Sequence, residues 1–250
     1  MSKFRKVMIG FLLIIALVCG SYSAYYFVKR AQVGKVYEVL AEDAKIVAPL
    51  VIEEQAEEKE PIPIDFEKLW EINPEIYAWI QIPGTTIDFP IVQSATDNNY
   101  YLNHSIEYQE GLPGSIFTEN RNNREFSDYN TIIYGHNMMD GSMFSPLHDF
   151  RDAEFFSTHS EIIIYTPEKK IVYEIFAAVG YTNENLLDKY DFSAADMRQS
   201  FIDSLQDERI AKGTVNYGEK ELIDKQLITL STCDDTQGAR RYLVVAAQKD

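Results

Sequence analysis

Between residues 61 and 250 the sequence alternates short apolar runs with turn-forming residues, and this pattern constrains the fold more than any other feature. The runs are rich in Val, Ile, Tyr and Phe and are too short for typical helices, which indicates β-strands. Eight short strands separated by turn signals predict a mainly β fold, either a closed barrel or a sandwich. The predicted strands are Trp79–Ile82, Ile87–Val92, Gly114–Thr118, Thr131–Tyr134, Glu161–Thr166, Ile171–Val179, Leu227–Thr232 and Tyr242–Ala247.

Helical patterns are a minor part of this domain and are expected at its periphery. The clearest one lies in the long insertion between the predicted strands Ile171–Val179 and Leu227–Thr232, where Met197, Phe201 and Leu205 follow helical spacing. Ser193 is expected to cap this helix, and Asp196 to complete a capping box. Insertions on the rim of a barrel often carry function, so we expect this one to form a wall of a substrate site.

The N-terminal segment predicts a membrane anchor. Residues 7–28 are almost wholly apolar or aromatic and carry no charge, and about 20 such residues cross a bilayer as a helix. Basic residues flank the segment on both sides, with a slight bias that favours an N-terminus inside the cell. We therefore expect residues 1–30 to form a cytoplasmic tip and one transmembrane helix. A cleaved signal peptide is the alternative, since Ser21 and Ser23 offer small residues at a suitable spacing.

An acidic tether is expected to follow the anchor. Residues 31–60 are rich in Glu, Lys and Ala and are predicted to be partly helical, and the run of acids ends at Pro61-Ile62-Pro63. Residues 61–250 then form one domain that is long enough for a good hydrophobic core. All 39 acidic residues of the chain lie beyond Lys35. Nucleic-acid binding needs a positive footprint, so the sequence argues against it.

Cys233 is the candidate nucleophile. It is the only cysteine beyond the N-terminal segment, and it ends a predicted buried strand, while Arg240 and Arg241 open the next one. If the two strands pair as a hairpin, a guanidinium lies near the sulfur, and a nearby cation favours the reactive thiolate. A lone thiol in an exported domain is open to oxidation, so its presence indicates a function.

A thiol nucleophile needs a partner that transfers protons, and His136 is the best candidate among four histidines. It follows a predicted strand and Gly135, so it is expected at a strand end on the same rim as Cys233. His104, His148 and His159 lie in loop or helix contexts. The scattered histidines and the single cysteine show no metal-ligand spacing, and no glycine motif for phosphates or dinucleotides occurs. We therefore expect no metal and no cofactor.

An ordered set of motifs resembles the sortase family, and class B within it. The set begins with Trp79–Gly84, Pro90–Gln93, Asn98–Leu102 and Gly114–Phe117, continues with Tyr134–Met138 and Gly141–Phe144, and ends with Thr229–Cys233 and Arg241. The long segment around His136 and the helix-bearing insertion resemble class B in particular. The resemblance covers about residues 65–248, which is nearly the whole exported domain.

The resemblance implies a closed eight-stranded sortase-like β-barrel and a cysteine transpeptidase. Cys233 is then the nucleophile, His136 the general acid and base, and Arg241 the stabilising cation, since it directly precedes the apolar final strand. Arg240 is the weaker candidate, because strand alternation turns neighbouring side chains to opposite faces. Such enzymes cut a sorting motif near the C-terminus of a secreted protein and join the new carboxyl end to an amine.

Three further residues are expected to orient or bind substrate. Alternation places Ser231 on the same face as Cys233, where it lines the groove, while Thr232 faces inward. Asn137 follows the candidate histidine. Asp235 lies where class B enzymes often carry an acid, although Asp234 and Asp235 also read as ordinary turn residues.

Substrate and location follow from the same resemblance. It favours a sorting motif of the Asn-Pro-x-Thr type, with a peptidoglycan-precursor or pilin amine as the acceptor, and a catalytic domain on the outside of the cell membrane. Two other readings stay open at this point. One is a hydrolytic cell-wall cysteine peptidase with the same Cys and His, and the other is an anchored wall-binding module in which Cys233 has no catalytic role.

Overall fold

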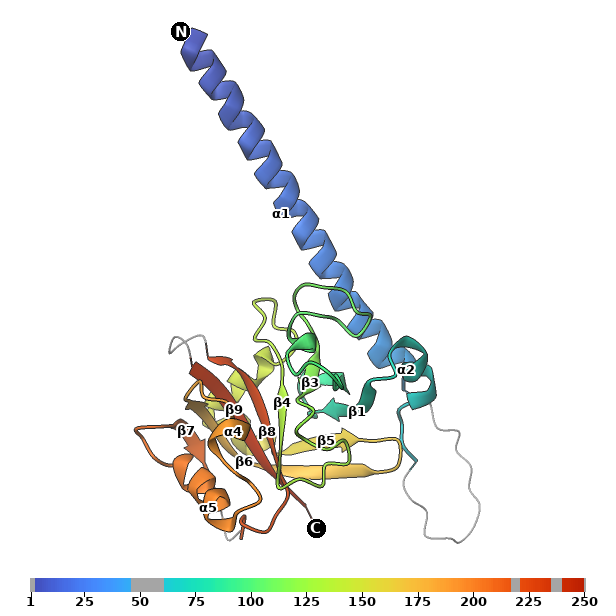
Figure 1. The fold of residues 1–250 in the computed structure, drawn as a ribbon, viewed down its shortest axis with the longest axis vertical. Helices are drawn as coiled ribbons and strands as arrows, with labels where there is room; N and C mark the ends of the chain where they lie inside the picture. The colour runs from blue at the N-terminus through green and yellow to red at the C-terminus, as the bar shows by residue number, and fades with distance from the viewer. Residues whose placement is uncertain (1–2, 46–60, 217–220, 235–239, 250) are drawn as a thin grey trace. The chain divides into compact units, whose positions relative to one another are not determined.

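The fold consists of two compact units, Met1–Leu40 and Ala41–Asp250, which are described separately (Figure 1). The computed structural model describes residues 3–45, 61–216, 221–234 and 240–249. Half of the predicted tether, from residue 46 to residue 60, lies outside the described residues, and so does Asp235. The division of the chain at residues 30 and 60 therefore stays a prediction.

The N-terminal unit is one helix. α1 (Lys3–Asp43) is 41 residues long, so the boundary predicted at residue 30 falls inside a helix. Its side chains between residues 11 and 25 are all exposed, although most of them are apolar. In the part of the chain that the structure describes, none of the helices combines the length and the apolar character that crossing a membrane requires. The transmembrane helix predicted over residues 7–28 is thus not confirmed.

The second unit is built on a single sheet that closes on itself. The strands follow one another in the order β5-β1-β2-β3-β4-β8-β9-β6-β7, and an additional pairing of β5 with β6 closes a ring of eight. This ring confirms the predicted closed eight-stranded barrel. Its strands are β1 (Ile76–Gln81), β2 (Asp88–Val92), β3 (Ile116–Thr118), β4 (Asn130–Tyr134), β5 (Glu161–Tyr165), β6 (Lys170–Tyr181), β8 (Leu227–Asp234) and β9 (Arg240–Gln248).

The sequence pattern missed one strand, β7 (Lys212–Val215), which extends the sheet beyond the ring. The 12-residue β6 makes this possible, because its first part pairs with β5 and its last part pairs with β7. No side chain of β7 is fully buried, so the apolar signal of a core strand is absent. Gly213 lies so close to the backbone of Ala178 that a Cβ there would clash.

Short helices surround the barrel, as predicted. They are α2 (Phe66–Ile72), η1 (Tyr100–Leu102), η2 (Ser145–Arg151), α3 (Ala153–Thr158), α4 (Leu186–Lys189) and α5 (Ala195–Ser204), where η marks a 3-10 helix. The last two lie in the predicted insertion, between β6 and β7. The α5 helix packs through Phe201 onto Tyr190 and Phe192, with edge-to-face ring contacts at 5.5 and 5.4 Å between centroids.

The predicted cap of α5 is wrong in detail. The N-cap residue is Ala194, and it makes no side-chain capping bond. The hydroxyl of Ser193 instead donates to Asp191 at 2.6 Å, because the two residues form a local turn ahead of the helix.

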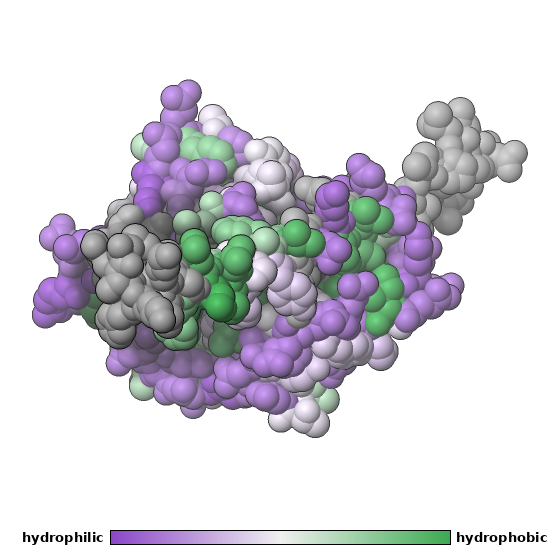
Figure 2. Space-filling model, turned by 90° about the horizontal axis from the view of Figure 1, so that it is seen from above, coloured by the Kyte–Doolittle hydropathy of each residue, from purple (hydrophilic) through white to green (hydrophobic). Residues whose placement is uncertain are grey.

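The barrel interior is apolar and its outside is largely polar. Trp79, Tyr173 and Phe176 are among the largest side chains with no exposed surface. Figure 2 shows hydrophilic side chains over much of the visible face, broken by smaller apolar patches. This distribution is that of a domain with one core, which agrees with the burial expected of a chain of this length.

The pairing of β4 with β8 matters most for function. These strands are parallel and come from segments almost 100 residues apart, and Tyr134 pairs with Ser231 in their register. Parallel strands end at the same edge of a sheet, so the residues that follow β4 and those at the end of β8 lie on one rim of the barrel. Antiparallel β9 then returns beside β8, with Arg241 directly opposite Cys233.

Candidate active site

Cys233 is the only exposed residue of β8, all other residues of which are buried. The strand therefore presents this thiol at the barrel rim, while its remaining side chains pack into the domain. The Nη1 of Arg241 lies 3.5 Å from the Sγ of Cys233. A guanidinium is always charged, so this contact sets a permanent positive charge beside the sulfur, where it stabilises negative charge.

Arg240 and Arg241 contact different groups. Arg240 donates from Nε to the carbonyl oxygen of Tyr181 at 3.1 Å and from Nη2 to that of Ile210. It thus ties the end of β6 to the segment that precedes β7. The alternation expected along β9 holds: Arg241 turns toward the thiol, and Arg240 turns toward these carbonyl groups.

His136 follows β4 through Gly135, whose backbone N–H donates to Ser231 O at 3.1 Å and extends the parallel ladder. A Cβ at residue 135 would lie within 2.7 Å of the side chains of Ile116 and Phe144, so only glycine fits between them. The tight approach of the chain at Gly135 sets the position from which His136 leaves the strand.

The ring of His136 is held by the loop that contains η1. Its Nε2 lies 2.7 Å from the carbonyl oxygen of Leu102. A carbonyl oxygen only accepts, so Nε2 carries the proton and Nδ1 is the nitrogen left for exchange. Within the described residues this ring makes no hydrogen bond to the Sγ of Cys233. The structure thus brings His136 to the same rim as the thiol and leaves it paired with Leu102.

Other predicted residues lie around the thiol. The Nδ2 of Asn137 approaches the carbonyl oxygen of Cys233 at 3.4 Å. Ser231 is buried and, together with Arg241, lines a cavity of about 70 Å³, of which Cys233 is not a lining residue. Thr232 has no exposed surface, as its inward-facing position predicts. The full lining of the cavity is Ile132, Tyr134, Tyr181, Thr182, Asn183, Glu184, Asn185, Leu186, Ser231, Arg241 and Leu243.

Sequence reasoning missed the support behind the nucleophile, which comes from η2. The Nε2 of His148 donates to the carbonyl oxygen of Cys233 at 3.0 Å, and its ring packs against Tyr242 at 4.9 Å between centroids. The guanidinium of Arg151 also lies over the ring of Tyr242, 4.9 Å from its centroid. Its Nη2 pairs with Asp234 at 2.8 Å. These contacts hold the end of β8 at Cys233 and Asp234.

Asp234 therefore is not the turn residue that the sequence suggested. It is the last residue of β8, and its side chain is 1% exposed and paired with Arg151. The signal that could have found this pair is weak, because Asp234 and Arg151 lie 83 positions apart in the sequence. Among the described residues no group of three His, Cys, Asp or Glu side chains is arranged to hold a metal ion.

These features define a class of protein: a closed β-barrel that presents a single cysteine on its rim, with an arginine at the sulfur and a histidine at the end of the neighbouring parallel strand. The family described as Sortase domain matches residues 80–249. The chain belongs to the sortase family.

The relatives agree with class B. Sortase B of Staphylococcus aureus is 28% identical over 98% of this chain and 97% of its own. Sortase B of Listeria monocytogenes is 35% identical over 68% of this chain and 67% of its own. The solved structure of a Staphylococcus aureus sortase B–substrate complex superposes with a TM-score of 0.63 at 32% identity, covering 74% of this chain and 84% of that one. The resemblance to class B is confirmed.

We predict that Arg151→Ala destabilises the domain by about 2 kcal/mol, because it removes an ion-pair partner of a carboxylate that is almost fully buried. Urea denaturation followed by tryptophan fluorescence measures the change. The matched control is Arg209→Ala, which breaks a pair with Asp207 in which the arginine is 88% exposed. Water screens this exposed pair, so its loss should change the free energy of unfolding much less. Equal losses in the two variants would contradict the supporting role of Arg151.

Proposed function

We propose that this sortase transpeptidase works through a thioester on Cys233, with His136 as the general acid and base and Arg241 as the cation that stabilises the oxyanion. The observation that carries the proposal is the contact of Arg241 with the sulfur of an exposed cysteine. The register of β8 and β9 places these two residues directly opposite each other, so their contact follows from the pairing of the strands.

The first half-reaction forms the thioester. The Sγ of Cys233 attacks the carbonyl carbon of the scissile peptide bond, and the carbonyl oxygen takes up negative charge. Arg241 lies beside the sulfur and is positioned to stabilise that charge. As the tetrahedral intermediate collapses, the C–N bond breaks, and a proton from His136 passes to the leaving amine.

The second half-reaction reverses the proton transfer. An incoming amine attacks the thioester carbon, His136 accepts its proton, and the C–S bond breaks to release Cys233 and a new amide. Transfer wins over hydrolysis only when the amine is held in place and water is limited. The contact with Leu102 supports this role of His136, because a carbonyl that accepts from Nε2 leaves Nδ1 to carry the moving proton.

The substrate proposed is a secreted protein with a C-terminal sorting motif of the Asn-Pro-x-Thr type, and the acceptor is a peptidoglycan-precursor or pilin amine. Support comes from the class B relatives, one of which was solved with its substrate. Ser231 is proposed to line the groove and Asn137 to hold the backbone of Cys233, in keeping with their positions. The proposed orienting role of Asp235 rests on the resemblance alone.

The proposed location is the outer side of the cell membrane, with the N-terminus inside. The apolar residues 7–28 support it, and so does the exposure of large apolar side chains such as Phe11 and Leu17, which are 63% and 72% exposed. Such surface is normally covered by lipid or protein.

Protease added to intact cells should digest the catalytic domain and spare a tag at the N-terminus. Protection of the whole chain until lysis would contradict this location.

We predict a mass adduct on Cys233 when the full chain in detergent is incubated with an Asn-Pro-x-Thr peptide. With triglycine added, a peptide joined to the amine should replace it. Cys233→Ala should abolish both products, whereas Cys19→Ala, which removes the other cysteine, should leave both unchanged. Cleavage at the same rate with and without triglycine would favour the hydrolase, and an unreactive Cys233 would favour the wall-binding module.

We also predict that Arg241→Gln lowers kcat/KM by about 10²–10³-fold, the loss typical when one oxyanion donor is removed. Steady-state kinetics with a fluorogenic sorting peptide measures it, and the melting temperature reports on folding. The neighbouring Arg240→Gln serves as the control. It breaks contacts to Tyr181 and Ile210 and should lower the melting temperature while the folded enzyme keeps its turnover. Near-normal turnover in Arg241→Gln would refute the role of Arg241.

A further inference from the structure

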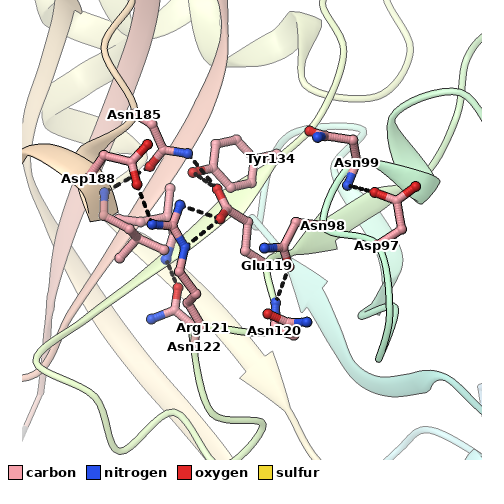
Figure 3. A network of polar contacts seen from close by, with 12 residues as sticks. Asp97, Asn98, Asn99, Glu119, Asn120, Arg121, Asn122, Tyr134, Asn185 and Asp188 are labelled. Carbon is pink, nitrogen blue, oxygen red and sulfur yellow. Dashed lines mark hydrogen bonds and ion pairs between the residues drawn. The ribbon is translucent and has the colours of Figure 1, made fainter.

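A buried carboxylate, Glu119, lies just beyond β3 and joins three parts of the chain (Figure 3). The residue is only 5% exposed. Its Oε1 accepts from the hydroxyl of Tyr134 at 3.0 Å and from the Nδ2 of Asn185 at 2.7 Å. Its Oε2 accepts from the Nε of Arg121 at 2.8 Å and from the Nη2 of the same guanidinium.

The donors come from functionally important elements. Tyr134 is the last residue of β4 and directly precedes Gly135 and His136. Asn185 is the N-cap of α4, where its Oδ1 accepts from the N–H of Leu187 at 2.9 Å, and so it opens the helical part of the insertion. Glu119 therefore connects the end of the catalytic strand with the start of the insertion.

Both of these donors line the cavity of about 70 Å³ at Arg241. Tyr134 and Asn185 lie on its wall together with Ser231 and Arg241, whereas Glu119 is not among the lining residues. The carboxylate thus acts behind the wall and holds two of its members at a fixed separation. A residue in this position sets the width of the cavity without touching what enters it.

Ion pairs stabilise the buried charge of Glu119 and include a residue of the insertion. A buried carboxylate is costly unless it is paired and hydrogen-bonded, and Arg121 supplies the pairing. Arg121 also reaches Asp188 on α4 at 2.5 Å, so the ion pair itself includes the insertion. Burial, followed by the charge of Glu119, raises the pKa of Tyr134 well above its ordinary value, and the hydroxyl keeps the proton that it donates.

The segment after β3 also forms hydrogen bonds with the loop that follows β2. The backbone N–H of Asn120 donates to the Oδ1 of Asn98 at 2.8 Å, and the Asn120 side chain donates to Ala95 O at 3.3 Å (Figure 3). The residues that follow Glu119 are therefore anchored on their other side, which gives the carboxylate a fixed base. A fixed base is what a group needs in order to position others.

We propose that Glu119 is a positioning residue for the transpeptidation: it fixes the separation of Tyr134 and Asn185 and thereby shapes the small cavity at Ser231 and Arg241, which forms part of the site that binds the sorting motif. The proposal rests on the proposed function, since it names a determinant of substrate binding at that site. A purely structural role would lower stability and leave the binding of substrate by the folded enzyme unchanged.

The test is the effect of Glu119→Gln on the kinetics of the full chain with a fluorogenic Asn-Pro-x-Thr peptide. The glutamine side chain has the same shape as glutamate but carries no charge. Its –NH2 group cannot accept hydrogen bonds from the donors that surround Glu119. We expect KM to rise about tenfold, which corresponds to about 1.4 kcal/mol. We expect kcat to stay within about twofold, and iodoacetamide to alkylate Cys233 at the wild-type rate, because the contact of Arg241 with the thiol is untouched.

A second variant keeps the test valid if Glu119→Gln does not fold. Asn185→Ser retains a good helix cap but is too short to reach Glu119, so it removes one link and preserves α4. KM should rise in this variant too. The control is Glu161→Gln, the same substitution in a surface pair with Lys249, which should leave KM and kcat unchanged.

The outcomes separate the two proposals. Wild-type turnover with an unchanged KM in folded Glu119→Gln or Asn185→Ser would overturn the role of Glu119 and leave the transpeptidase intact. A fall in kcat together with slower alkylation of Cys233 would overturn it as well, since the effect would then lie at the nucleophile. Absence of turnover in the wild-type chain would overturn both proposals.

Discussion

The parallel pairing of β4 with β8 is the interaction on which the proposed active site depends. Parallel strands need a long connection, and here almost 100 residues separate Tyr134 from its partner Ser231. That connection forms β5, β6 and the insertion, so the elements that close the barrel and build its rim are the same ones that allow the pairing. Because both strands end at one edge, the histidine and the cysteine reach the rim together.

The antiparallel return of β9 gives the site its charge. The register that places Arg241 opposite Cys233 also sends Arg240 to the carbonyl groups of Tyr181 and Ile210. A slip of one residue would exchange the two side chains and turn the cation away from the sulfur. Residues 242–247 of β9 are buried on both faces of the strand, so a slip would place each side chain in a packed site of the wrong shape. Packing of β9 in the core thus keeps Arg241 opposite Cys233 by fixing the register of β8 and β9.

The sequence predicted what depends on local pattern. The eight strands of the ring followed from their apolar β-branched runs, and Cys233 followed from its place at the end of one such run. The pattern offered Arg240 and Arg241 together, and the resemblance to the sortase family selected Arg241. It did not predict β7, which has no buried face, or the support from His148 and Arg151, which reaches β8 only through the folded chain. Contacts over such separations leave no local periodicity, so a single sequence does not show them.

Glu119 illustrates how a groove wall can be held where apolar packing is a poor solution. The wall of a substrate cavity faces water for part of each cycle, so side chains there gain less from burial than those of the core. Hydrogen bonds to a charged group are directional and short, and they hold Tyr134 and Asn185 at defined distances. The cost of the buried charge is met by Arg121, which ties itself to α4. The network is satisfied only with the insertion docked, so the same contacts that stabilise the insertion also define the shape of the site.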